Sequence, residues 1–177
     1  MNKKFTRYVL VFIFIFCMLY YCTIAMIGLT TKGGYYNEFA ATYLNYIAGL
    51  RWILLHSSKL LLHSIGFDVY LKDVYTIRQV NGAGVHVGYD CIGYGVMFFW
   101  IAFIIANTGT VFSKLKWISG GLLIIECINI LRISLMVIAV NKKWLLPFKL
   151  DNHTLYNIVA YLVVFSMIYF FDKVNKT

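Results

Sequence analysis

Long apolar runs dominate the pattern of hydrophobic and polar positions along the chain. Stretches long enough to span a bilayer cover roughly residues 8–29, 91–110, 115–140 and 154–171. A helix needs about 20 consecutive apolar residues to cross the hydrocarbon core, so each run predicts a transmembrane helix. We therefore predict an all-α integral membrane protein with about four transmembrane helices, organised as a single membrane domain over residues 1–177.

Residues 39–66 follow a different pattern. Trp52, His56, Lys59 and His63 recur at steps of three and four and form one polar stripe on an otherwise apolar helix. A helix with such a stripe typically lies in the membrane interface, so we predict an interfacial amphipathic helix here. A fifth membrane crossing by this segment remains an open alternative.

Residues 68–90, "DVYLKDVYTIRQVNGAGVHVGYD", are the main polar stretch between the apolar runs. Valine and tyrosine flank an Asn-Gly pair, which is a strong signal for a tight hairpin turn. We predict a short β-hairpin that leads the chain to Cys91, at the start of the run 91–110. Residues 91–171 would then form a three-helix core.

Composition supports a membrane protein. The chain is 61% hydrophobic and 13% charged, with a mean hydropathy of +0.75, whereas a soluble domain is about half apolar and a quarter charged. The net charge of +9 comes from basic residues at the ends of apolar runs. This placement favours contact with anionic lipid and control of topology, and we expect no nucleic-acid partner.

The positive-inside rule predicts the topology. The basic N-terminal segment precedes a long apolar run without a convincing cleavage site, which predicts a retained signal anchor at 8–29 with its N-terminus inside. The hairpin, Cys91 and the loop 141–152 would then face outward from a multi-pass protein of the cytoplasmic membrane. Three lysines in that outer loop oppose this scheme: Lys142, Lys143 and Lys149.

Three residues of different chemistry converge toward the outward side in this topology. Cys91 begins one predicted helix, Arg132 lies in the outer half of the next, and His153 begins the last. A thiolate attacks a carbonyl, and a helix N-terminus with nearby positive charge favours the thiolate form of a cysteine. Arginine can stabilise an oxyanion, and histidine can transfer the proton that a leaving amine requires. The spacing predicts a cysteine-based catalytic site.

Simpler roles remain open for each of these residues. Cys91 could pack as a small apolar side chain, Arg132 could extend its charge to the interface, and His153 could be an ordinary polar residue at a helix start. Supporting roles are predicted for Asn129, one turn from Arg132, for Asp90, which could orient His153, and for Gly93, which would let a peptide backbone approach. For Glu126 we favour an intramembrane partner over a catalytic role.

No spacing in the chain suggests a cofactor or a metal site. The four cysteines fit neither a zinc site nor a disulfide framework, and zincin, phosphate-loop and serine-elbow motifs are absent from the sequence.

Residues 45–160 resemble the exosortase/archaeosortase family of membrane transpeptidases. The resemblance rests on an amphipathic segment ending "LLLHSIGF", then "YDCIGYG", "NILRI" and "DNHTLYN", in that order. It implies that Cys91 is the nucleophile, Arg132 the arginine of an Asn-x-x-Arg motif, and His153 the third member. The family commonly has Ser-Gly after the cysteine, where this chain has Ile92-Gly93, and the chain would be a minimal catalytic core.

The resemblance implies a sorting enzyme. Such an enzyme cleaves exported proteins near a C-terminal motif that precedes a transmembrane helix and a basic tail. The acyl group then passes to an acceptor amine or to water. Expected partners are therefore the C-terminal sorting-signal helix of exported proteins and membrane lipid. Two other classes stay open: a non-catalytic membrane scaffold, and a small transporter that uses Glu126 and Arg132.

Overall fold

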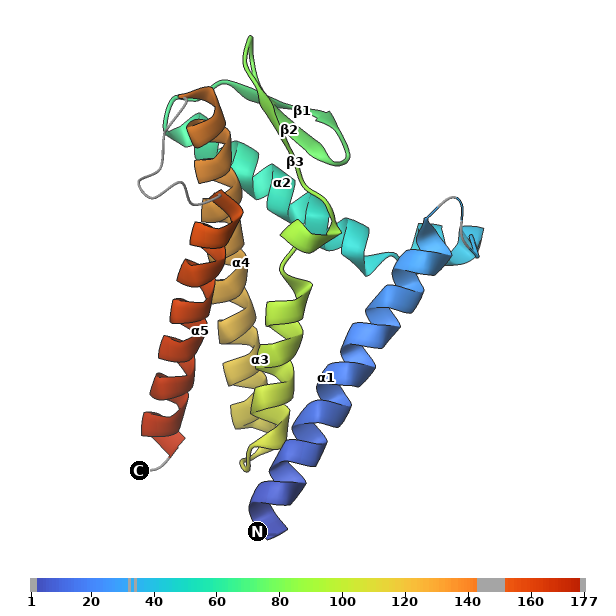
Figure 1. Ribbon diagram of the computed structural model, residues 1–177, viewed down its shortest axis with the longest axis vertical. Helices are drawn as coiled ribbons and strands as arrows, with labels where there is room; N and C mark the ends of the chain where they lie inside the picture. The colour runs from blue at the N-terminus through green and yellow to red at the C-terminus, as the bar shows by residue number, and fades with distance from the viewer. Residues whose placement is uncertain (1–2, 32, 34, 143–151, 176–177) are drawn as a thin grey trace. The chain divides into compact units, whose positions relative to one another are not determined.

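The computed structural model describes residues 3–31, 33, 35–142 and 152–175, with the side chains of the final helix described from 157 to 174. Helices dominate, and three short strands of an antiparallel sheet follow the second long helix in the chain (Figure 1). The elements are α1 (Lys3–Thr30), a π-helical turn η1 (Ala40–Leu44), α2 (Tyr46–Ser64), β1 (Val69–Asp73), β2 (Thr76–Gln79), β3 (Gly84–His86), a 3₁₀ turn η2 (Tyr89–Cys91), α3 (Tyr94–Ala106), α4 (Val111–Asn141) and α5 (Asn152–Asn175).

The chain divides into two compact units. Unit 1 comprises residues 1–50 and 94–122, and unit 2 comprises residues 51–93 and 123–177. In unit 1, α1 packs along α3, where the rings of Phe12 and Phe99 meet edge to face at 5.4 Å. Such aromatic contacts add specific geometry to apolar burial. Unit 1 is therefore a helical assembly, whereas unit 2 also contains the sheet.

The sheet is a three-stranded antiparallel meander in the order β1-β2-β3. The predicted Asn-Gly pair does lie in the turn that joins β2 to β3, where Asn81 has a positive φ of 57° and the Gly82 N–H donates to the Gln79 carbonyl at 3.0 Å. The prediction of a two-stranded hairpin was wrong, because β1 pairs with β2 through a second tight turn at 74–75. The Tyr75 N–H donates to the Asp73 carboxylate at 2.8 Å in this turn and lowers the pKa of Asp73.

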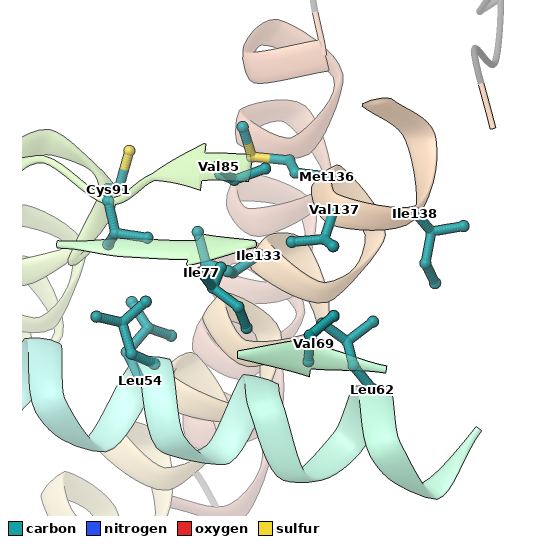
Figure 2. Close-up of a cluster of buried hydrophobic side chains, with 12 residues drawn as sticks. Leu54, Leu62, Val69, Ile77, Val85, Cys91, Ile133, Met136, Val137 and Ile138 are labelled. Atoms are coloured by element: carbon teal, nitrogen blue, oxygen red, sulfur yellow. The ribbon is translucent and has the colours of Figure 1, made fainter. Parts of the chain in front are cut away.

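The sheet contributes one buried side chain from each strand to the apolar core of unit 2: Val69, Ile77 and Val85. Ile77 lies opposite Val85 in the register of β2 and β3, and both side chains are buried. They belong to the same buried cluster as Leu54 of α2 and Ile133 of α4 (Figure 2). The core is completed by Leu55, Leu62, Val87, Cys91, Met136, Val137 and Ile138.

A stripe on α4 contacts the sheet and its flanking turns. Asn129, Ile133, Val137 and Asn141 recur at steps of four residues, which places them on one helix face. The two apolar members are fully buried. Asn141 clamps the β2–β3 turn, since its amide accepts from the Ala83 N–H at 2.7 Å and donates to the Ala83 carbonyl at 3.2 Å. The stripe therefore has an amide anchor at each end.

Three described helices are long and apolar enough to cross a membrane: α1, α4 and the part of α5 from Asn157 to Val174. The chain is accordingly a membrane protein by the length and composition of its helices. The prediction of a span over 91–110 was wrong in extent, because α3 covers only Tyr94–Ala106. At 1.5 Å per residue, this helix reaches about 20 Å, short of the roughly 30 Å hydrocarbon core.

The segment 39–66, predicted as one helix, forms the turn η1 and the separate helix α2, and its placement in the membrane interface stays a prediction. The helix α2 begins at Tyr46, later than predicted, and it is not among the candidate spans within the described chain. Trp52, His56 and His63 are exposed, whereas Leu54 and Leu62 on the other face are fully buried. Three of the four residues of the polar stripe therefore face away from the core of unit 2, whereas Lys59 is half-buried.

Candidate functional site

Cys91 lies in a 3₁₀ turn and not at the start of an α-helix, which corrects the sequence prediction. Its N–H donates to the Gly88 carbonyl at 3.1 Å, and α3 begins only at Tyr94. The side chain retains 8% exposure at one end of the apolar core. Figure 2 shows the Cys91 sulfur directed away from Leu54. Dipole assistance from the first turn of an α-helix, which falls off within one turn, is correspondingly reduced.

Asn129 ties α4 to the turn that carries Cys91. Its side-chain amide donates to the Ile92 carbonyl at 3.0 Å and is only 5% exposed. Gly93 follows with a φ of +77°, and a Cβ on this residue would collide with the Asn129 amide. Asn129 and Gly93, the two residues predicted to support the site, therefore pack against each other. Together they hold the backbone on the C-terminal side of Cys91.

The other two members of the predicted triad lie on separate helices. Arg132 is half-buried on α4, beside the fully buried Ile133. His153 belongs to the first turn of α5, but its side chain lies outside the described residues. Asp90, the predicted partner of His153, is exposed in the 3₁₀ turn. The convergence of Cys91, Arg132 and His153 therefore stays a prediction.

Arg51 was missed by the sequence analysis. Its guanidinium lies between two aromatic rings, 4.2 Å from the Tyr75 centroid and 4.8 Å from the Tyr89 centroid. The side chain is only 4% exposed, and its Nε–H has no hydrogen-bond partner among the described residues. The sole sequence signal was a basic residue beside Trp52 in an apolar helix. Arg51 links α2 to a turn of the sheet and to the 3₁₀ turn of Cys91.

Replacing Arg51 by alanine is expected to destabilise unit 2 by about 2 kcal/mol. The substitution removes two desolvated cation–π contacts and leaves a void between the tyrosines. Arg51→Lys keeps the charge but loses the planar stacking, so we expect about half of this cost. Denaturant unfolding of the purified chain in detergent measures both, with Lys72→Ala on exposed β1 as the control. An unchanged free energy of unfolding in Arg51→Ala would contradict the role assigned to the stack.

Three other titratable residues, His86, His56 and Glu126, lie outside the predicted triad. His86 lies exposed on β3 and stacks on the Tyr75 ring at 5.7 Å, and His56 contacts the Trp52 carbonyl at 2.8 Å within α2. Glu126 is half-buried on α4, and its Oε1 has no hydrogen-bond partner in the described part of the chain. No group of three or more metal-ligating residues gathers among the residues that the structure describes.

No protein-family model matches the chain, and no similar protein was found among curated proteins or among solved structures.

Proposed function

We propose that the chain is a membrane-embedded cysteine transpeptidase or protease that cleaves the C-terminal sorting signal of exported proteins. The observation that carries the proposal is the hydrogen bond from Asn129 to the Ile92 carbonyl. It joins two of the segments on which the resemblance to exosortases rests, "YDCIGYG" and "NILRI", although they lie 37 residues apart in the chain. The bond also places the Asn-x-x-Arg helix against the turn of the proposed nucleophile.

The proposed reaction begins with attack of the Cys91 thiolate on the scissile carbonyl. Arg132 stabilises the negative oxygen of the tetrahedral intermediate, because a guanidinium offers several donors to an oxyanion. His153 gives a proton to the leaving amine, and the C–N bond breaks to leave a thioester on Cys91. An acceptor amine, or water, then attacks the thioester and releases the thiolate.

The membrane setting suits this substrate. A sorting signal that contains its own transmembrane helix can approach by lateral diffusion, so that only its motif must reach Cys91. We place the site at the outward surface of the cytoplasmic membrane, as the distribution of positive charge in the sequence predicts.

One observation favours a second candidate, a non-catalytic membrane scaffold. Cys91 is largely buried and belongs to the same apolar cluster as Ile77 and Ile133, and buried cysteines are most often inert packing residues. A scaffold should tolerate the loss of the thiol, whereas the enzyme requires it.

We expect Cys91→Ala to stop trimming of the substrate. The assay expresses a tagged exported protein from the same genome that carries a C-terminal motif, helix and basic tail, and follows its size in cells. Removing a catalytic nucleophile lowers kcat by a factor on the order of 10⁴ or more, so full-length precursor should accumulate. Cys127→Ala is the matched control, because Cys127 is an exposed thiol on α4. Trimming that continues in Cys91→Ala would favour the scaffold.

A further inference from the structure

A basic pocket lies in unit 1, separate from the residues of the proposed active site. It has a volume of about 560 Å³ and is formed by the first turns of α1, the end of α3, the loop after α3 and the first turn of α4. Lys4, Arg7 and Lys114 contribute positive charge to its wall, and Asn107 and Thr108 contribute polar groups. Among the lining residues, all of which the structure describes, none is acidic.

The helix α1 presents one face to this pocket. Lys4, Arg7, Tyr8 and Val11 all line it, and their spacing of three and four residues places them on the same side of the helix. Lys4 and Arg7 lie at the N-terminal end of α1, whereas Val11 lies one turn after Arg7, in the apolar part of the helix. The wall on α1 thus changes from charged to apolar along the helix.

Lys114, in the first turn of α4, lines the pocket and bonds to the end of α3. Its Nζ donates to the Ile105 carbonyl at 2.8 Å, at the C-terminal end of α3. A cation at this position compensates the partial negative charge of the helix end. An ammonium group has three N–H donors, so this contact leaves donors for a further acceptor. Arg7 is exposed, and its guanidinium presents a forked set of donors.

We propose that this pocket binds the phosphate of an anionic phospholipid. Three cations in a pocket whose described lining includes no Asp or Glu suit an oxyanion, and forked guanidinium donors match phosphate oxygens. The volume falls within the range of sites for small ligands. A lipid fits better than a free phosphate, because α1 is a candidate membrane span whose apolar side chains Leu10 and Phe14 are 63% and 69% exposed just beyond the cations. Acyl chains can lie along that surface while the headgroup occupies the basic end.

The test measures lipid binding to the full-length chain, purified in detergent, by native mass spectrometry. The probes are phosphatidylglycerol and phosphatidylcholine with identical acyl chains, and inorganic phosphate as a competitor. We expect phosphatidylglycerol to bind at least tenfold more tightly than phosphatidylcholine. Arg7→Gln and Lys114→Gln should each weaken phosphatidylglycerol binding about fivefold, whereas Arg7→Lys should retain most of it.

Lys116→Gln is the matched control. Lys116 lies on the same helix two residues after Lys114, but its ammonium is placed over the Phe112 ring at 4.4 Å and does not line the pocket. It should bind phosphatidylglycerol like the unmodified chain. Three results would overturn the proposal: equal binding of the two lipids, an equal loss in Lys116→Gln, or displacement of the lipid by millimolar inorganic phosphate. The last would identify a free-phosphate site.

Discussion

Gly121→Ala is expected to destabilise unit 1 by about 2–3 kcal/mol. A Cβ on Gly121 would overlap the indole ring of Trp100, nearest to its Nε1. Trp100 is fully buried, and its indole N–H donates to the Trp117 carbonyl at 2.9 Å. The ring must therefore shift in a packed interior and weaken this bond. Overpacking costs about 1–3 kcal/mol, and an unsatisfied buried donor costs a similar amount.

The neighbouring residue provides the control. A Cβ on Gly120 would meet no atom within 4 Å, so Gly120→Ala introduces no collision. Alanine is favoured over glycine inside a helix by about 1 kcal/mol, and this variant should be unchanged or slightly more stable. Thermal unfolding of the purified chain in detergent, followed by tryptophan fluorescence, compares the two. Equal unfolding temperatures for the two variants would show that Trp100 does not pack against Gly121 as described.

Features that depend on local sequence were predictable. The apolar runs predicted the positions of α1, α4 and α5, because the length of a run directly reflects the thickness of the bilayer. Trp52, His56 and His63 of the predicted polar stripe are exposed on α2. The Asn-Gly pair predicted the turn between β2 and β3 through its preference for positive φ.

Features that depend on contacts between distant segments were not predictable. The sequence gives no sign that Arg51 meets Tyr75 and Tyr89, since cation–π stacking has no fixed spacing along a chain. The late start of the helix predicted over 91–110, at Tyr94, has the same cause. The residues before Tyr94 form a 3₁₀ turn, and the Asn129 amide donates to the Ile92 carbonyl that follows it. A run of apolar residues in the sequence does not reveal such a contact.

The candidate site falls between these extremes. The sequence singled out Cys91, Asn129 and Gly93, and the structure brings the last two together beside the first. The Asn129 amide donates to the Ile92 carbonyl, whereas a contact between Asn129 and Arg132, which their spacing of one helical turn suggests, stays a prediction. An amide inside an apolar helix suggested that Asn129 has a hydrogen-bond partner, but the partner depends on how α4 is oriented against the Cys91 turn.

Gly93→Ala is expected to have the largest effect at the candidate site, with a loss of about 3 kcal/mol in the free energy of unfolding. A φ of +77° costs a residue with a side chain about 1–2 kcal/mol. The collision of the new Cβ with the Asn129 amide adds an overpacking cost. Because the residue adjoins the Cys91 turn, the proposed trimming activity should also fall. Gly95→Ala, where a Cβ would meet nothing within 4 Å, is the control and should behave like the unmodified chain.

Combining Gly93→Ala with Asn129→Ala separates the two causes. Asn129→Ala alone leaves the Ile92 carbonyl without its partner and should cost about 1–2 kcal/mol. In the double variant the collision is gone, since alanine is too short to reach the new Cβ, but the backbone strain remains. The double variant should therefore be more stable than the sum of the single costs predicts, by about 1–2 kcal/mol. Strict additivity would mean that Asn129 and Gly93 do not touch, and the hydrogen bond that links α4 to the turn of Cys91 would then lose its support.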